Sequence, residues 1–186
     1  MTAKFNPDGT VTRAEFLKMA MDSFGIVGHA YRDGECLDAT NDDWYCYYLQ
    51  GALDKDIIPK EMIENCDFTN VTKMLKESTE KEKAVRANVN VYTGKFYGDK
   101  PITREEMAVI ATRCKNYKMR NWRDWDNERR YPIFSFKDSD EIDEKYISYV
   151  VEAYDLNYID GMEDGRFAPK ENLTRAQAAV VMNNLK

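Results

Sequence analysis

The sequence predicts an all-α protein built from three helix-loop-helix repeats, and three observations support this fold class. One tetrapeptide occurs three times, each time directly before an apolar run with helical spacing. A second, tyrosine-containing segment occurs twice, with its apolar residues also at helical spacing. The 186 residues are 43% hydrophobic and 32% charged, which is typical of an ordinary globular domain that can form a core.

The repeated tetrapeptide marks the expected start of three helices. Its Thr and its Glu or Gln stand three positions apart, which is the capping box: the hydroxyl accepts from the amide at the third helical position, and the longer side chain accepts from the cap amide. We therefore expect helices that begin near residues 12, 103 and 174 and pack around a shared core. The three copies are Thr12-Arg13-Ala14-Glu15, Thr103-Arg104-Glu105-Glu106 and Thr174-Arg175-Ala176-Gln177.

The tyrosine-containing segment predicts two further helices, near residues 43–54 and 144–155. Its two copies stand at a constant offset of 101 positions, as Tyr45 and Tyr146 illustrate. The spacing of three, four and seven residues places aromatic and aliphatic side chains on one helical face. We expect four tyrosines to be buried, each with a polar partner for its hydroxyl: Tyr45, Tyr48, Tyr146 and Tyr149.

These segments divide the chain into three repeats. The first spans residues 1–30 and lacks its opening helix, so the chain is expected to begin inside a repeat. The second spans residues 31–118 and contains a Lys- and Glu-rich insertion at about residues 62–91. The third spans residues 133–186. Residues 119–132 contain two tryptophans and four arginines, which could stack on a base or a sugar ring, but their nearly balanced charge favours a linker packed between repeats.

Composition argues against several classes of protein. The net charge of −6 is unsuited to a nucleic-acid partner. No stretch approaches the roughly 20 apolar residues of a membrane span, and residues 1–9 contain no signal-peptide core, so an exported form is expected to have lost its signal. A single histidine and the lack of G-x-S-x-G, P-loop and H-E-x-x-H motifs predict neither catalytic residues nor a cofactor.

The four cysteines, Cys36, Cys46, Cys66 and Cys114, show no C-x-x-C spacing, so no metal site is expected. In an oxidising compartment they could form two disulfides. Cys46 stands in an aromatic helical stretch and is equally compatible with a buried free thiol. Both states stay open, with free thiols favoured.

The capping box does not explain why arginine follows the threonine in all three copies. A cation at the first helical position faces the positive end of the helix dipole, which is unfavourable by about 0.3 to 1 kcal/mol at exposed sites. A bound carboxylate or phosphate would reverse this argument, because a guanidinium and free helix amides together bind anions. A salt bridge to an acid of a neighbouring repeat would also explain it. Both explanations stay open.

These motifs together resemble the S-layer homology (SLH) domain. The third repeat carries the pattern in Phe136-Lys137-Asp138, in residues 161–169 and in residues 173–177. The first repeat keeps Phe5-Asn6-Pro7-Asp8-Gly9 and residues 11–15. The second keeps Trp44 and residues 102–106, but its loop is enlarged and altered.

The resemblance implies a pseudo-threefold helical bundle that anchors a secreted protein noncovalently to the bacterial cell wall. The implied partner is an anionic secondary cell-wall polysaccharide or peptidoglycan-linked glycan, often carrying pyruvate ketals, with self-association in a surface layer as a further partner. The family pattern implies anion contacts at Arg13, Arg104 and Arg175. It implies capping or hydroxyl-binding groups at Glu15, Glu106 and Gln177. It implies groove walls at Asp8, Gly9, Asp164 and Gly165. The altered loop predicts that the groove of the second repeat has lost binding.

Two other functions are compatible with the sequence. A protein-interaction domain of a surface-layer assembly could use the same scaffold and would present exposed apolar patches instead of basic grooves. A calcium-binding module is suggested by the EF-hand-like frame of Asp160, Asp164, Gly165, Phe167 and Glu171. Met162 and Pro169 stand in that frame where a calcium loop needs other residues, which weakens the calcium hypothesis.

Overall fold

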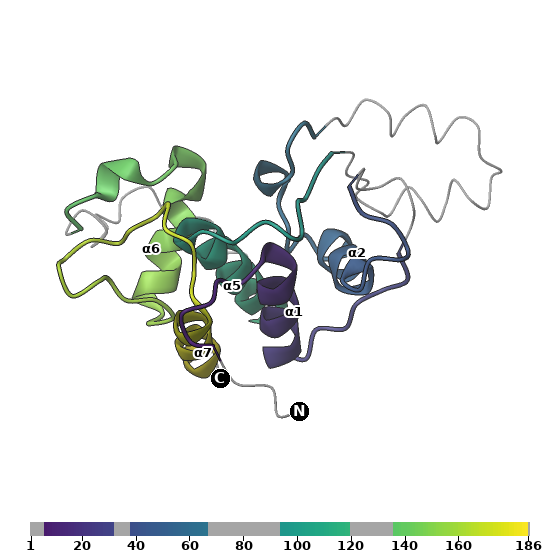
Figure 1. Cartoon of the computed structure of the whole chain (residues 1–186), viewed down its shortest axis with the longest axis horizontal. Helices are drawn as coiled ribbons and strands as arrows, with labels where there is room; N and C mark the ends of the chain where they lie inside the picture. The colour runs from purple at the N-terminus through teal and green to yellow at the C-terminus, as the bar shows by residue number, and fades with distance from the viewer. Residues whose placement is uncertain (1–5, 32–37, 67–93, 120–135, 186) are drawn as a thin grey trace. The chain divides into compact units, whose positions relative to one another are not determined.

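The computed structural model describes residues 6–31, 38–66, 94–119 and 136–185, and the regular elements in these residues are helices, which confirms the all-α class (Figure 1). Of the predicted linker (residues 119–132) and the predicted insertion (about residues 62–91), the structure describes only Met119 and residues 62–66. The α-helices are α1 (Arg13–Ser23), α2 (Cys46–Asp54), α5 (Arg104–Met119), α6 (Ile147–Asp155) and α7 (Arg175–Asn184). Short 3-10 helices are η1 (Lys60–Met62), η3 (Ser139–Glu141) and η4 (Glu144–Tyr146).

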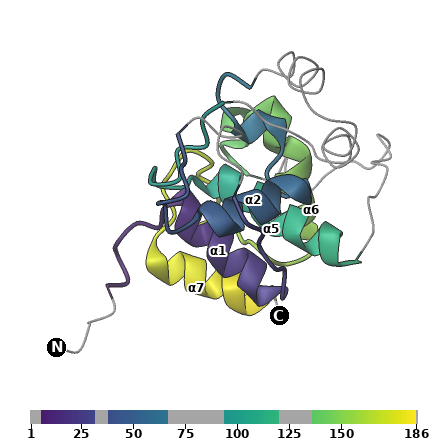
Figure 2. The same cartoon turned by 90° about the vertical axis from the view of Figure 1, so that its right-hand side faces the viewer.

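The chain forms two compact units. One comprises Met1–Ile26 and Asp99–Lys186 and contains α1, α5, α6 and α7, whereas the other comprises Val27–Gly98 and contains α2. Within the first unit, α5 packs against both α1 and α6, and α1 also packs against α7 (Figure 2). The arginine sites discussed below lie in this unit. The repeat boundaries expected from the sequence stay a prediction.

All three tetrapeptides begin a helix as predicted. Thr12 and Thr174 are N-caps whose hydroxyls accept from the amides of Glu15 and Gln177, and both capping boxes are complete. At the remaining helix start, that of α5, the Glu106 amide donates to the Thr103 hydroxyl at 3.4 Å, and the Thr103 amide donates to the Glu106 carboxylate at 3.2 Å. The α-helices start one residue after each threonine.

The residues directly before the three tetrapeptides form a closed ring of backbone hydrogen bonds. Val11 N donates to Leu173 O at 3.0 Å, Leu173 N donates to Ile102 O at 2.9 Å, and Ile102 N donates to Val11 O at 2.9 Å. All three side chains are buried. This ring sets the three helix starts in cyclic order around one point of the core.

The amides of the three repeated arginines form a second cycle, which runs in the opposite direction. Arg13 N donates to Lys100 O, Arg104 N donates to Glu171 O, and Arg175 N donates to Gly9 O. Each helix therefore begins against the loop of the next repeat in the cycle. The side chains of Arg13 and Arg104 accordingly bind Glu106 and Phe167, 93 and 63 positions away in the chain, whereas Arg175 is exposed.

The two tyrosine helices confirm the offset found in the sequence. Helices α2 and α6 each have 9 residues. Each is followed by a residue in the left-handed region, Asp56 with φ of 54° and Asn157 with φ of 56°. Tyr45 and Tyr146 are buried as predicted, but Tyr48 and Tyr149 are only partly buried, so the prediction is half right.

An aspartate clamp that the sequence analysis did not predict closes the loops of the second and third repeats. The Asp138 carboxylate accepts from the amides of Phe167 and Ala168, both at 2.7 Å. Asp38 accepts in the same way from the amides of Phe96 and Tyr97. Although the loop of the second repeat is enlarged in sequence, it ends in the same clamped turn as the third.

Candidate functional site

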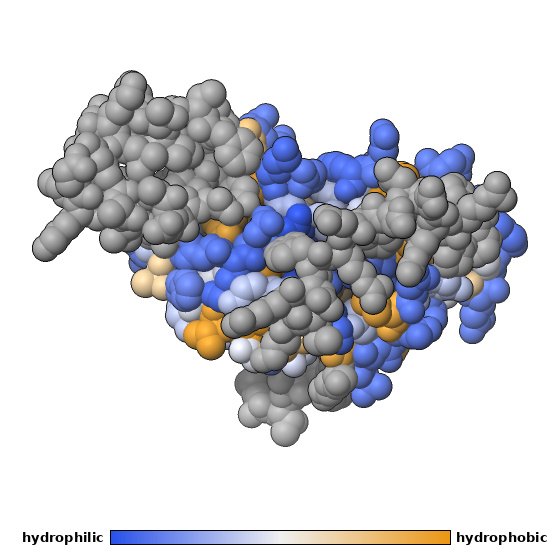
Figure 3. All heavy atoms as spheres, turned by 180° about the vertical axis from the view of Figure 1, so that it is seen from behind, coloured by the Kyte–Doolittle hydropathy of each residue, from blue (hydrophilic) through white to orange (hydrophobic). Residues whose placement is uncertain are grey.

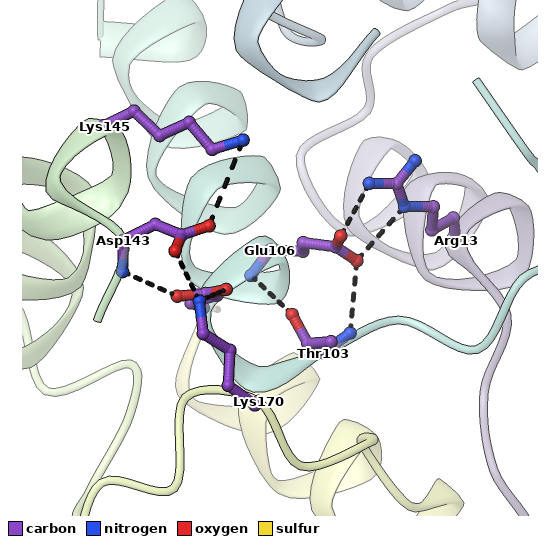
Figure 4. A network of polar contacts seen from close by, with 7 residues as sticks. Arg13, Thr103, Glu106, Asp143, Lys145 and Lys170 are labelled. Carbon is purple, nitrogen blue, oxygen red and sulfur yellow. Dashed lines mark hydrogen bonds and ion pairs between the residues drawn. The ribbon is translucent and has the colours of Figure 1, made fainter. Parts of the chain in front are cut away.

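Arg13 is buried in an ion pair with an acid of the neighbouring repeat. Its Nε and Nη2 donate to the two carboxylate oxygens of Glu106, at 3.1 and 2.6 Å. The two side chains are 6% and 9% exposed. Figure 4 shows the Glu106 carboxylate between Arg13 and Thr103, which it also caps. For Arg13, the structure therefore supplies the salt bridge that the sequence left open as one of two explanations.

A second group of charges lies beside this ion pair. The buried Glu105 carboxylate accepts from Lys170 Nζ at 2.6 Å and from the Asp143 amide at 3.1 Å. Lys170 Nζ also lies 2.6 Å from the Asp143 carboxylate (Figure 4). Burial raises the pKa of Glu105 above its ordinary value, and the hydrogen bonds from Lys170 and Asp143 offset only part of that effect. These contacts join the start of α5 to the loops of the third repeat.

Arg104 occupies the equivalent position in α5 but has different partners. Its Nε donates to Phe167 O at 2.7 Å and its Nη2 donates to Asp160 O at 2.8 Å. The guanidinium also lies over the Phe167 ring, with its Cζ 5.1 Å from the ring centroid. Among the described residues no carboxylate lies within 4.0 Å of it.

Arg104 is therefore a buried cation held by neutral groups. The residue is 6% exposed. Burial lowers the pKa of its guanidinium, and the more distant charges of Glu171, Asp138 and Asp160 partly oppose this effect. Two of its five N–H donors serve the carbonyls, and no buried side-chain nitrogen in the described residues is unsatisfied. The Nη1 group accordingly reaches the surface.

Arg104 lines a pocket of about 180 Å³. One wall is the start of α5, a second is the loop around residues 158–162, and the third is α7. The pocket combines one guanidinium with amide and apolar groups, and its lining includes Arg104, Met107, Gly161, Met162, Gln177 and Val180. Two predicted site residues, Arg104 and Gln177, thus lie together.

The origin of this pocket differs from the sequence expectation. The groove of the second repeat was expected to have lost binding because its own loop is altered. The helix that carries Arg104 instead begins against the third repeat, so Gly161 and Met162 form the pocket wall. The altered loop of the second repeat does not contribute to the lining of this pocket.

Arg175, the third repeated arginine, is exposed and lies against the loop of the first repeat. Its amide donates to Gly9 O at 2.8 Å, and its Cδ would lie 3.3 Å from a β-carbon placed on Gly9. Asp8 is exposed beside this contact. The structure thus brings together three predicted site residues, Arg175, Asp8 and Gly9, at a different position from the Arg104 pocket.

Asp164 and Gly165 form a turn outside the lining of the Arg104 pocket. The Asp164 carboxylate accepts from Arg166 Nε at 2.7 Å, and Arg166 Nη1 lies 3.2 Å from Glu171. Arg166 thus lies between two of the carboxylates that suggested a calcium loop. In the part of the chain that the structure describes, no three His, Cys, Asp or Glu side chains are grouped as metal ligands.

Three of the four cysteines are described, and Cys46, Cys66 and Cys114 form no disulfide with one another. Cys114 is fully buried in α5, and burial raises the pKa of its thiol. Cys36 lies outside the described residues.

Comparison with known families decides the family of this arrangement. The model of the S-layer homology domain matches residues 89–108 and 135–179, which contain the Arg104 helix start and most of the pocket walls. The chain contains S-layer homology repeats. An SLH match supports, in general terms, a noncatalytic module that anchors proteins at the cell surface.

Three larger proteins resemble nearly the whole chain. Exoglucanase XynX of Acetivibrio thermocellus is 31% identical over 98% of the chain, and amylopullulanase of Thermoanaerobacterium thermosulfurigenes is 29% identical over 98%. An endoglucanase of Bacillus sp. (strain KSM-635) is 29% identical over 97%. The SLH chain spans only 13%, 8% and 15% of these proteins, respectively. No described helix is long and apolar enough to cross a membrane.

Proposed function

We propose that this SLH module anchors a secreted protein to the bacterial cell wall by binding an anionic secondary cell-wall polysaccharide in the Arg104 pocket. The observation that carries the proposal is the buried guanidinium without a carboxylate partner at the pocket wall. A buried charge that lacks an opposite charge is costly, and an anionic ligand group would offset that cost. A carboxylate such as that of a pyruvate ketal has the charge and the geometry that a guanidinium binds best.

The remaining pocket walls suit a sugar. The backbone around Gly161 lets a ring approach closely because glycine has no side chain. The amides of Gln177 and Asn184 are hydrogen-bonding groups for hydroxyls, although Gln177 also caps its own helix. Apolar side chains such as Met107 and Val180 provide contacts for the less polar face of a sugar or for a ketal methyl group.

Arg175 and the Asp8-Gly9 turn form a second proposed anion contact, because this arginine is exposed at a helix start. Arg13 is proposed to have a structural role, since its Nε and Nη2 bind Glu106 and the side chain is 6% exposed. Glu15 and Glu106 are likewise proposed as caps rather than sugar contacts.

Sedimentation with purified cell-wall sacculi tests this function. The chain should sediment with sacculi and should stay in solution after acid treatment has stripped their polysaccharide. Binding should also weaken as salt is added, because a charged contact near the surface is screened. Equal sedimentation with stripped sacculi would contradict the polysaccharide as the ligand, and salt-independent binding would contradict the charged contact.

A pocket-filling variant separates this site from the rest of the surface. Met162→Trp should reduce binding without changing any charge, because the larger side chain occupies the pocket that Met162 lines. Lys18→Gln, on the exposed side of α1, is the control for a change outside the pocket and should bind as the unmodified chain does. Unchanged binding of Met162→Trp would place the ligand elsewhere.

A further inference from the structure

Polar side chains dominate the face of the molecule drawn in Figure 3, where hydrophobic areas are small and lie among hydrophilic ones. One group of polar side chains, in the unit Val27–Gly98, has a chemistry that the proposed anchoring function does not use. It consists of Asp54 and Lys55, at the end of α2, and of His29, the one histidine of the sequence. The Arg104 pocket belongs to the other unit.

The His29 imidazole contacts both of the other side chains. Its Nδ1 lies 2.6 Å from Asp54 Oδ2, and its Nε2 lies 3.1 Å from Lys55 Nζ. An ammonium group only donates hydrogen bonds, so Nε2 accepts from Lys55. The ring proton is then on Nδ1, which donates to the Asp54 carboxylate. In this arrangement the imidazole is neutral, and its basic nitrogen faces the lysine.

Backbone and side-chain contacts hold the three groups in place. The His29 amide donates to Tyr47 O at 3.0 Å, which fixes this residue against α2. A β-carbon on the preceding Gly28 would lie 2.4 Å from the Tyr47 ring, so glycine is needed for this close approach. The fully buried Gln50 donates to the second oxygen of the Asp54 carboxylate at 3.1 Å. The orientation of the imidazole is therefore set by the fold.

Lys55 has the properties of an activated amine. Burial lowers the pKa of its ammonium group, and the charge of Asp54 opposes this effect only in part. The Lys55 side chain is partly exposed and that of His29 is 49% exposed, so a reagent in solution can reach both. A nucleophile beside a base that a third group orients is the arrangement found in activated nucleophiles.

We propose that Lys55 is a covalent modification site that forms an amide with an activated acyl ester, with His29 as its base and Asp54 as the positioning residue. His29 Nε2 takes up a proton from the Lys55 ammonium group. The resulting amine attacks the acyl carbon, a C–N bond forms, and the C–O bond to the alkoxide or phenoxide leaving group breaks. The proton on His29 and a second proton from the nitrogen pass to the solvent.

Trace acetylation of the full chain with para-nitrophenyl acetate tests this site. Mass spectrometry of its peptides gives the acetylation rate of Lys55 relative to that of Lys60, an exposed lysine of the same unit. At neutral pH Lys55 should react at least about tenfold faster than Lys60. His29→Gln should remove most of this difference, because an amide cannot take up the proton. Equal rates at Lys55 and Lys60 in the unmodified chain would overturn the proposal.

The pH profile distinguishes a base from a histidine that only supports the fold. Around neutral pH the rate at Lys60 should rise about tenfold per pH unit, as the free-amine fraction of an ordinary lysine does. The rate at Lys55 should rise less steeply, because its proton passes to His29 within the chain instead of to the solvent. In His29→Gln the slope for Lys55 should become as steep as that for Lys60.

Asp54→Asn tests the positioning role. The asparagine keeps an oxygen that accepts from Nδ1 but lacks the charge that stabilises a protonated imidazole. The rate at Lys55 should therefore fall, while its pH slope stays shallow because His29 still takes up the proton. Circular dichroism of both variants should match that of the unmodified chain. A slope for Lys55 that is unchanged in His29→Gln would assign the reactivity to burial alone and overturn the role of His29.

Discussion

At the scale of single residues, the buried ion pair between Arg13 and Glu106 can be separated from the capping box. Glu106→Gln keeps an oxygen that can cap Thr103, as Gln177 does for Thr174, but removes the negative charge that Arg13 needs. We expect a loss of about 3 kcal/mol or more in the free energy of unfolding, because a buried guanidinium is left without its partner. Urea denaturation measures this loss.

The matched control is Glu15→Gln, which changes a capping carboxylate that is partly exposed. Its cost should stay below about 0.5 kcal/mol, as for other surface substitutions. Equal costs for the two variants would mean that capping, and not the buried pair, accounts for the role of Glu106.

Glu105 predicts a pH dependence of stability with a definite sign. Burial raises the pKa of Glu105 in the folded state above the ordinary value of 4.5, so the folded chain takes up this proton more readily than the unfolded chain. This contribution to stability therefore grows as the pH falls through the raised pKa. Glu105→Gln cannot titrate at this position.

We compare the free energy of unfolding of the unmodified chain with that of Glu105→Gln by urea denaturation, at neutral pH and at a pH just above the ordinary carboxyl pKa. The unmodified chain should be more stable relative to the variant at the lower pH. If the unmodified chain instead loses stability relative to Glu105→Gln on acidification, the hydrogen bonds from Lys170 and Asp143 outweigh the burial of the carboxylate.

The sequence identified the three arginines but could not distinguish their environments. Arg13, Arg104 and Arg175 occupy the same motif position, yet their partners are a carboxylate, two carbonyls and an exposed loop, respectively. These partners come from other repeats, more than 50 residues away for Arg104. A local motif contains no information about which acid or carbonyl the fold places beside it.

At the scale of helices, the first two residues of the α7 motif should contribute differently to stability. Thr174→Ala removes a complete cap and should cost about 1 kcal/mol. Arg175→Ala should change stability by less than about 0.5 kcal/mol, because Arg175 is exposed and faces the positive end of the helix. Urea denaturation measures both changes. A larger loss for Arg175→Ala than for Thr174→Ala would identify Arg175 as a structural ion-pair residue.

The helices were largely predictable, and the loop closure was not. Capping boxes and apolar spacing are local signals, so they predicted the starts of α1, α5 and α7 and the offset between α2 and α6. The Asp138 clamp joins residues 29 and 30 positions apart. The equivalent Asp38 clamp joins residues 58 and 59 positions apart. The one sequence signal for the two clamps is that Asp38 and Asp138 stand 100 positions apart, close to the offset between the tyrosine helices.

At the scale of the molecule, the cyclic ring of backbone hydrogen bonds explains why the Arg104 pocket combines two repeats. Because Ile102 bonds to Val11 and Leu173, the start of α5 is fixed against the third repeat, and Arg104 follows directly. The SLH match of residues 89–108 and 135–179 supports the anchoring role in general terms but does not assign a ligand to this pocket. The buried Arg104 guanidinium, which has no carboxylate partner among the described residues, is the physical reason to propose an anionic ligand.

The most direct test of this account is the affinity of Arg104→Gln for cell-wall sacculi, measured by sedimentation after its fold has been checked by circular dichroism. Glutamine can still donate to one of the two carbonyls that Arg104 binds, but it has no charge. We predict binding weaker by about 1.5 to 3 kcal/mol, the contribution of a charged hydrogen bond, while Lys18→Gln, with the same change of net charge, binds as the unmodified chain does. A folded Arg104→Gln variant that sediments with sacculi as the unmodified chain does would contradict Arg104 as the anion contact.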